Sequence, residues 1–525
     1  MEHLEQRQKV IIMIAIMSAM FFAAINMTIV GTALPKIISQ IGGMDYFDWV
    51  FTIYMLSSTI TAMLVGRLSD IYGRKVFILI GIGVFMTGAF LSGTSDTIIQ
   101  LIIYRGIQGF GGGMIMSAAF TTVGDLFSPR ERGRWQGMFA GVFGLSSLFG
   151  PTLGGYIVDN FNWHWVFWIF LPIGFIAFFL IWKLYPTHIR QEKQSIDYLG
   201  SFVLTLVIIS LLLGFSWGGN EYEWLSYQII GLFSFTIIGL VVFIFIEKRV
   251  ENPVIPLHLF KNQVFTLSNI AGLFLGMGMF GVIMYTPFFV QGVLGRTATV
   301  SGLVEMAMTI SMVILSTIGG QLITKTGKYK TIALVGLVLM ALGLFLNSLL
   351  HPDSSLLRLI LQLIIIGMGL GMAMPVFQVT VQNAVKHQYL GVATSVMQVF
   401  RQIGGTIGVA VMGTILGQLM KNRLEEVNTQ PASAPLPEEM NERLAELQNP
   451  QLLMDLDVIE EMRSSFPTEM ITLFDQLILT MRDVLNYSLT GVFLFSAIIV
   501  TCGVVVTAFI KEIPLRTTNR DEDTE

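Results

Sequence analysis

Charged residues are scarce in this chain of 525 residues: Asp, Glu, Lys and Arg together make up 13% of it. Ordinary soluble domains carry about 25%. Hydrophobic residues make up 53%, and apolar runs such as 10–34 and 489–510 reach or exceed the roughly 20 residues that a helix needs to cross a bilayer. The shortage of charge therefore excludes an ordinary soluble protein and predicts an all-α polytopic membrane protein.

Cysteine is almost absent as well. The single residue, Cys502, lies inside the last apolar run, so an intrachain disulfide and a cysteine metal site are both excluded. The glycine clusters at 109–113 and 150–155 do not match G-x-x-x-x-G-K-[ST], and no strand precedes them, which argues against nucleotide binding. No nucleophilic arrangement or carboxylate pair occurs in the spans. We therefore expect a monomeric protein that is not an enzyme and that binds no metal, cofactor or nucleic acid.

The apolar runs define fourteen expected spans. The first run is too long for the apolar region of a secretory signal and has no small-residue cleavage site, so we expect it to remain in the mature protein. The spans are expected at 10–34, 47–68, 75–95, 98–120, 134–158, 163–185, 198–218, 225–247, 264–291, 299–324, 329–350, 355–384, 390–421 and 484–511.

Lys and Arg are distributed unevenly between the two sides of these spans. If both termini lie on one side, that side holds 21 of them, whereas the short loops of the other side hold only Lys36, Arg296 and Arg358. By the positive-inside rule, this asymmetry puts both termini in the cytoplasm and the chain in a cell membrane. The acidic stretch 422–483 then lies outside, with helical spacing at Glu438–Gln448 and Gln451–Arg463. It is interpreted as a solvated decoration, or as a lid or docking element.

An internal repeat relates the two halves of the chain. Gly66, Gly73 and Arg74 follow the second span with the same spacing that Gly320, Gly327 and Lys328 show after the tenth. Internal repeats are common in secondary transporters. We therefore expect an N-terminal six-helix bundle at 1–196, a linker helix pair at 197–262, a C-terminal six-helix bundle at 263–421 and 484–511, an outer segment at 422–483 and a tail at 512–525.

Four motifs give the sequence a family resemblance. The 66–75 segment resembles the signature loop of the major facilitator superfamily, and 105–111 resembles its buried-arginine motif. The 150–155 segment resembles the family's antiporter motif, and 163–174 resembles the sixth helix of fourteen-span drug:proton antiporters. The resemblance covers almost the whole chain and implies two six-helix bundles with two extra helices between them.

The resemblance also implies roles for individual residues. A charge cluster around the signature loop would close the cytoplasmic side, and the antiporter motif would take part in gating. The candidate gating residues are Gly66, Asp70, Gly73, Arg74 and Lys75 of the loop, and Gly150 and Pro151 of the antiporter motif. Arg105 would belong to the proton-coupling machinery. An unpaired charge inside a span costs at least about 2.5–3.5 kcal/mol, so Arg105 must face the bundle interior and have a partner. Arg401 is a second candidate of the same type.

One expected acid is missing. Drug antiporters of this family usually have an aspartate before the Thr-Ile-Val stretch of the first helix, where this chain has Asn26. An amide cannot titrate. Three explanations compete. Proton coupling has moved to another acid, for which Glu305 in the tenth span is the best candidate; or Asn26 is an engineered replacement that traps one conformation. In the third, transport is not proton-driven.

Few polar residues are expected to face the interior. Asn26, Arg105 and Glu305 are candidates for proton coupling, and the candidate substrate-binding residues are Asn26, Tyr54, Tyr285, Gln378, Gln398 and Arg401. A cavity with many apolar walls suits hydrophobic, often cationic drugs or dyes. The favoured interpretation is therefore multidrug efflux by proton antiport with alternating access. The alternatives are an exporter of an endogenous lipid, fatty acid or metabolite, and an uncoupled membrane sensor or scaffold.

Overall fold

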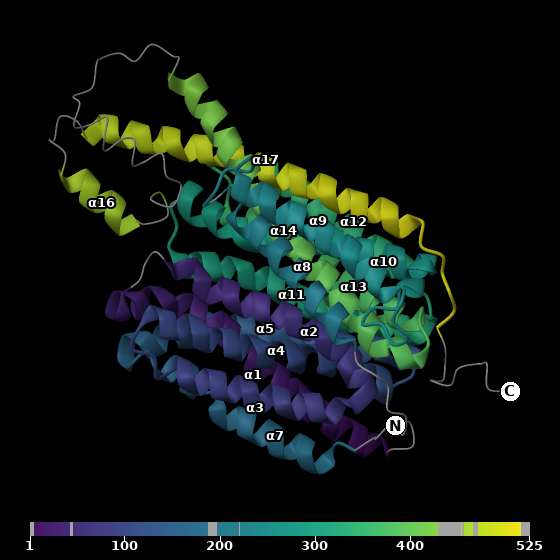
Figure 1. Ribbon diagram of the computed structural model, residues 1–525. Helices are drawn as coiled ribbons and strands as arrows, with labels where there is room; N and C mark the ends of the chain where they lie inside the picture. The colour runs from purple at the N-terminus through teal and green to yellow at the C-terminus, as the bar shows by residue number, and fades with distance from the viewer. Residues whose placement is uncertain are drawn as a thin grey trace.

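The computed structural model describes residues 5–42, 46–186, 197–219, 221–428, 453, 456–465 and 471–515. Long helices, lying side by side, make up most of these residues (Figure 1). The α-helices are α1 (Gln6–Ile41), α2 (Phe47–Tyr72), α3 (Arg74–Ser92), α4 (Ile98–Leu126), α5 (Pro129–Asn160), α6 (Trp165–Trp168), α7 (Leu171–Leu184), α8 (Tyr198–Trp217), α9 (Tyr227–Glu247), α10 (Gln263–Pro287), α11 (Ala298–Thr326), α12 (Lys330–Asn347), α13 (Leu356–Asn383), α14 (Leu390–Asn428), α16 (Leu456–Ser465) and α17 (Ile471–Ala508). Short helical turns of other types lie at Leu257–Lys261, Phe288–Val293 and His387–Tyr389.

Each of the fourteen expected spans corresponds to a helical segment. By length and composition, 13 segments in the described part of the chain are apolar enough to cross a membrane. The expected fourth span is α4, a helix of 29 residues that falls outside these 13. It contains Arg105, Gln108 and six glycines, which lower its hydropathy. Because 20 of its residues are buried, α4 meets other helices rather than lipid and tolerates this polarity.

The helices differ from some expected spans in continuity and in length. The sixth span is divided into α6 and α7, and Pro172 stands in the first turn of α7, where the missing proline N–H has no cost. The last two spans continue as helix far beyond the expected limits, since α14 runs to Asn428 and α17 begins at Ile471. Of the expected outer helical pieces, Gln451–Arg463 contains the start of α16, which ends two residues later at Ser465. The other piece, Glu438–Gln448, lies outside the described residues.

The buried apolar side chains form two clusters. One contains residues of α1 to α7 and of the segments that join them. The other contains residues from α8 to Leu515, beyond the end of α17, together with Leu56, Ile60 and Met63 of α2. Figure 1 shows the corresponding halves, with the purple and blue helices below the teal, green and yellow ones.

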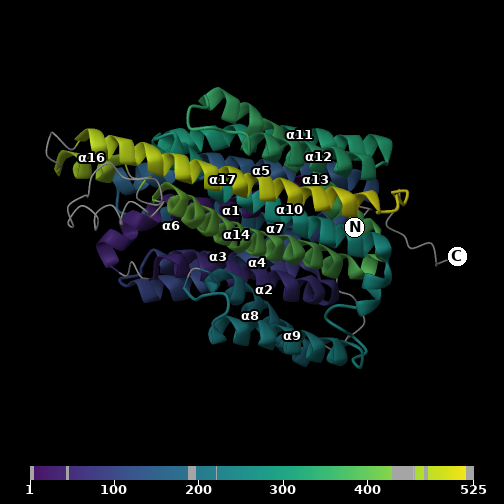
Figure 2. The ribbon, with the colours of Figure 1, turned by 90° about the horizontal axis from the view of Figure 1, so that it is seen from above.

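The helices α8 and α9 lie at one edge of the molecule, next to α2 (Figure 2). They pack against each other, and α8 also packs against α2 and α14. This position is compatible with an inserted pair that belongs to neither bundle. We therefore keep the division at 196, 262, 421 and 483 as a proposal.

The internal repeat has a structural counterpart. Gly73 directly follows α2 and Gly327 directly follows α11, and both glycines have a positive φ, 91° and 70°. A side chain at either position would be strained. The repeated glycine therefore ends the same kind of helix in each half.

Candidate functional site

One end of the bundle carries a network of buried charges. We call it the basic end; it contains Arg67, Arg74, Lys75, Arg130 and Lys328. There Arg74 of α3 pairs with Asp70 of α2 and, through Nε, with Asp125 of α4 at 3.1 Å. His387 lies 3.4 Å from the same Asp125 carboxylate.

The Asp70 carboxylate also connects the two halves. Its oxygens accept hydrogen bonds from the backbone N–H groups of Gly391 at 3.1 Å and Val392 at 3.2 Å. These groups belong to the first turn of α14, where the helix dipole favours a negative charge. We call Asp70, Arg74, Asp125 and these two N–H groups the gate cluster. It joins α2, α3 and α4 to α14 at the basic end.

Glycines bring the helix backbones into contact at two crossings of the same end. A Cβ atom at Gly66 of α2 would lie 2.8 Å from the carbonyl oxygen of Gly391 in α14. A Cβ atom at Gly133 of α5 would lie 2.7 Å from the carbonyl oxygen of Gly320 in α11. Both crossings join one half to the other, and neither leaves room for a methyl group.

Arg130 strengthens the second crossing. Its guanidinium donates hydrogen bonds to the carbonyl oxygens of Thr324 at 2.7 Å and Lys325 at 2.9 Å, in the last turn of α11. A cation is favourable at a helix C-terminus, where carbonyl oxygens lack helical partners. The N-terminal half therefore presents an anion to the start of one helix of the other half and a cation to the end of another.

Nearer the opposite end, a second cluster surrounds Arg105, which is fully buried. Its Nη1 donates to Gln108 Oε1 at 2.7 Å and to Asn26 Oδ1 at 3.5 Å, and Gln108 Nε2 donates to Asn26 Oδ1 at 2.8 Å. The guanidinium lies 4.4 Å from the centre of the Tyr54 ring, within the range of a cation–π contact. We call these four residues the arginine cluster. The expected interior position and partner of Arg105 are both present.

The partners of Arg105 are neutral. Its Nε and Nη2 and the Nδ2 of Asn26 have no hydrogen-bond partner among the described residues. Glu305, the other candidate for proton coupling, lies on α11, and among the described residues it makes no hydrogen bond or ion pair with the arginine cluster. The Glu305 side chain is half-buried, and its Oε1 has no hydrogen-bond partner in the described part of the chain.

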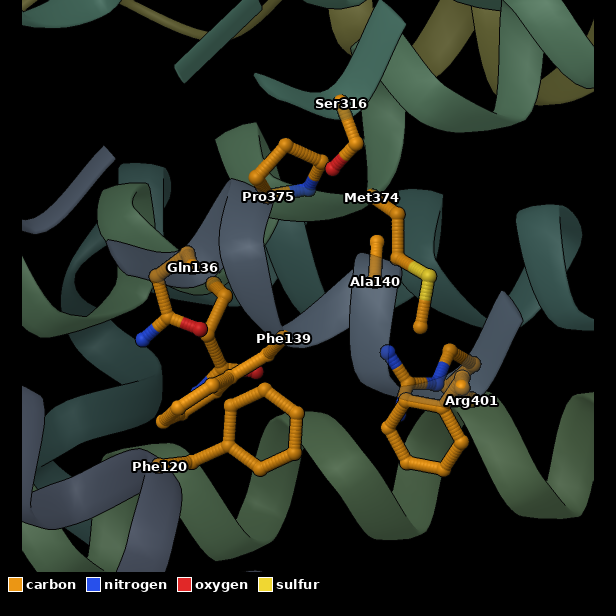
Figure 3. Close-up of a pocket in the computed structure, with 10 residues that line it drawn as sticks. Phe120, Gln136, Phe139, Ala140, Ser316, Met374, Pro375 and Arg401 are labelled. Carbon is orange, nitrogen blue, oxygen red and sulfur yellow. The ribbon is translucent and has the colours of Figure 1, made fainter. Parts of the chain in front are cut away.

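A cavity lies where the two halves meet. We call it the seam cavity; it is lined by Phe120 of α4, Gln136, Phe139, Ala140 and Phe143 of α5, Ser316 of α11, Met374, Pro375 and Gln378 of α13, and Arg401 of α14. Figure 3 shows how Gln136, Phe139 and Arg401 lie around it. Its volume is about 10 Å³, which is the space of one water molecule. The structure therefore represents a form in which this site is almost closed.

The remaining expected residues lie apart from one another. Tyr285 donates a hydrogen bond to the Val409 carbonyl at 3.1 Å, and Gln398 is buried with its Nε2 unpartnered among the described residues. Gly150 packs directly against Thr28 of α1, and α5 continues as helix through Pro151. Of the six substrate-binding residues expected from the sequence, Asn26 and Tyr54 belong to the arginine cluster, Gln378 and Arg401 line the seam cavity, and Tyr285 and Gln398 belong to neither.

Sequence reasoning missed several residues of these sites. Gln108 stood within a recognised motif but was not expected to bridge Arg105 to Asn26. Gln136 and Ser316 line the seam cavity, and Asp125 completes the gate cluster. A polar residue inside a span was the available signal for Gln136 and Ser316. Asp125 lacked even that, because a charge near a helix end is common.

Comparison with known proteins identifies the family. A family model described as Major Facilitator Superfamily matches residues 16–409. The chain belongs to the major facilitator superfamily. This family places the chain among membrane transporters rather than enzymes.

Two curated relatives from Bacillus subtilis (strain 168) match this superfamily member over most of their length. It is 37% identical to the Multidrug transporter protein MdtP, over 99% of this chain and 96% of the relative. It is 34% identical to Multidrug resistance protein 3, over 97% of this chain and 96% of the relative. Among solved structures, the human organic anion transporter MFSD10 (TETRAN) matches with a TM-score of 0.60 and 14% identity, covering 94% of this chain and 99% of that chain. At that identity the match shows the shared fold alone.

Proposed function

We propose that the chain exports hydrophobic, amphipathic compounds, drugs and dyes among them, in exchange for protons. The observation that carries this proposal is the seam cavity, which lies between the two halves and has mostly apolar walls. Ligand sites of this kind combine apolar walls with a few polar groups. The names of the two Bacillus subtilis relatives, a multidrug transporter and a multidrug resistance protein, support drugs as cargo.

Alternating access is the proposed mechanism. The gate cluster and the two glycine crossings hold the halves together at the basic end. By the positive-inside rule we assign this end, and with it both termini, to the cytoplasm of a cell in whose membrane the protein is embedded. Separation of the halves at the basic end would open the seam cavity to cytoplasmic cargo, and closure would commit the cargo to the other side.

Glu305 is the proposed site of proton exchange. The arginine cluster has an amide at the position where a first-helix carboxyl is expected, and an amide cannot bind and release a proton at physiological pH. Glu305 has a carboxyl within a span, and its Oε1 has no hydrogen-bond partner among the described residues. Arg105 would then respond indirectly, through the packing of the two halves.

Proteoliposomes loaded with a fluorescent dye test this proposal under an imposed pH gradient. We expect the unaltered chain to move dye, and Glu305→Gln to reduce gradient-driven movement by at least about tenfold, as is typical when a proton-transfer group is removed. Movement of dye down its own gradient is expected to remain. Glu223→Gln makes the same chemical change at an exposed position and is expected to have no effect.

Other results have separate meanings. If the unaltered chain is inactive and Asn26→Asp restores exchange, then the first-helix position is the coupling site and Glu305 is not. If dye fails to move under any gradient in any variant, transport itself is contradicted, and an uncoupled sensor or scaffold becomes the better interpretation.

A further inference from the structure

Arg401 occupies an unusual position for a cation. It lies 11 residues beyond the first residue of α14, which is about 16 Å along the helix axis at about 1.5 Å per residue. Within the part of the chain that the structure describes, no hydrogen bond or ion pair involves its guanidinium. A charge at this depth normally has a partner or marks a functional pathway.

The polar groups around Arg401 are also unsatisfied. Gln136, Gln378 and Ser316 line the same cavity and are only 3%, 2% and 0% exposed. Both amide atoms of each glutamine, and the Ser316 hydroxyl, have no hydrogen-bond partner among the described residues. Buried polar side chains are usually hydrogen-bonded. Polar groups from both halves, Arg401 among them, therefore converge on a cavity without hydrogen-bond partners among the described residues.

The composition of the cavity wall determines which guest would fit. No lining residue is acidic, and Arg401 supplies the one formal charge of the lining. A cationic guest would meet a like charge in a region of low dielectric constant, whereas an anion would gain charge-assisted hydrogen bonds. A planar carboxylate matches the fork of a guanidinium. The rings of Phe120, Phe139 and Phe143 provide apolar contact for the rest of the guest.

We propose that the seam cavity is a binding site for amphipathic anions, in which Arg401 binds a carboxylate with help from the Gln136 and Gln378 amides. The aromatic side chains bind the apolar body of the same molecule. This inference rests on the proposed export function and specifies its substrate class, and it replaces the expected preference for cations with a preference for anions. Opening of the seam supplies the space, because the closed cavity holds only about one water molecule.

Three pyrene probes of almost equal size test the charge preference. They are pyrenebutyrate, pyrenebutanol and pyrenebutyl-trimethylammonium, which are anionic, neutral and cationic. Their binding to the purified full-length protein is measured from the ligand-dependent rise in its thermal unfolding midpoint. We expect the carboxylate to bind at least about tenfold more tightly than the other two, which is about 1.4 kcal/mol.

Variants assign this preference to the cavity. Arg401→Gln is expected to abolish the advantage of the carboxylate and to leave the alcohol unaffected, while Arg401→Lys retains part of it. Gln136→Leu removes one amide and is expected to weaken only the carboxylate, which keeps the test available if Arg401→Gln does not fold. Arg249→Gln alters an exposed arginine in the same way and serves as the matched control.

Equal binding of the three probes, tighter binding of the ammonium, or an unchanged preference in both Arg401→Gln and Gln136→Leu would overturn the inference. Proteoliposome efflux distinguishes this failure from failure of the proposed function. If the neutral or cationic probe is exported while no preference for the anion exists, the transporter stands and the anion site does not. If none of the three probes is bound or moved, both proposals fail.

Discussion

At the scale of single residues, the most informative position is Asn26. Its side-chain oxygen accepts hydrogen bonds from both Arg105 and Gln108, while its own N–H₂ group has no described partner. The amide therefore provides an acceptor to a buried cation without compensating its charge. This geometry explains how Arg105 tolerates the absence of an acid and why that absence has a thermodynamic cost.

Asn26→Asp is expected to stabilise the protein. A carboxylate at this position would provide Arg105 with an ionic partner, and hydrogen bonds to charged groups contribute about 1.5–3 kcal/mol. The measurement is the thermal unfolding midpoint of the purified protein at neutral pH. Asn347→Asp is the matched control, because Asn347 is also fully buried and both its amide atoms lack described partners. That control should destabilise the protein, and an unchanged or lower midpoint in Asn26→Asp would contradict the prediction.

The sequence predicted part of this residue-scale arrangement. A charge such as Arg105 inside a span has to be buried and partnered, so its position could be inferred. Its partners could not, because Asn26 and Gln108 are 79 and 3 residues away in the chain and their meeting depends on how α1 packs against α4. Neutral polar residues such as Gln136 give an even weaker signal, since an amide in a span has many possible neighbours.

At the scale of helices, the glycine crossings determine how closely the halves approach. The α2–α14 and α5–α11 crossings bring backbone against backbone, at Gly66 with Gly391 and at Gly133 with Gly320. An added Cβ atom would meet a carbonyl oxygen that belongs to a helix and cannot move aside. The helices themselves would still form.

Gly66→Ala and Gly320→Ala are therefore expected to hold the basic end open and to reduce transport by at least about tenfold, while the protein remains folded. The reason is that forced backbone contacts cost about 1–3 kcal/mol, which is enough to shift a two-state equilibrium tenfold. Dye efflux measures the effect, and size-exclusion chromatography verifies the fold. Gly83→Ala is the control, because a Cβ atom there would have no neighbour within 4 Å. Full activity in both variants would show that the crossings are not tight during transport.

Asp70→Asn tests the gate cluster independently of packing. The substitution removes the negative charge that pairs with Arg74 and that accepts hydrogen bonds from two backbone N–H groups of α14. Because the closed form would lose about 1.5–3 kcal/mol of stabilisation, the basic end should open more often. In a Cys502→Ser background, Ser316→Cys reports opening by its rate of reaction with a polar thiol reagent in inside-out vesicles, and we expect an increase of about tenfold. Asp96→Asn makes the same change at an exposed position and is the control, which should leave the reaction rate unchanged. An unchanged rate in Asp70→Asn as well would show that the gate cluster does not limit opening.

At the scale of the whole molecule, the fold was the most predictable feature. The number of spans follows from apolar run length, which depends on local sequence alone. The boundaries were less predictable, because α14 and α17 continue beyond the apolar runs through polar residues that still favour helix. The break between α6 and α7 was missed because the aromatic residues around it have the hydropathy of a continuous span.

The orientation of the molecule can be tested with two exposed positions. In a Cys502→Ser background, Glu460→Cys on α16 should react with a membrane-impermeant maleimide added to intact cells, and Lys328→Cys between α11 and α12 should not. Both native side chains are exposed, so burial does not protect either position. The opposite labelling pattern would place the basic end outside and contradict the assignment by positive residues.

The glycine crossings have a further consequence for the entropy of the transport cycle. Closing an interface between long side chains costs up to about 1.5–2 kcal/mol for each side chain that loses its rotamer freedom. Glycine has no rotamers to lose, so the crossings at Gly66 and Gly320 can close and separate without that cost. Under the proposed alternating access, the open and closed forms would then differ little in free energy. A weakly bound cargo molecule or a single proton would suffice to shift the balance between them.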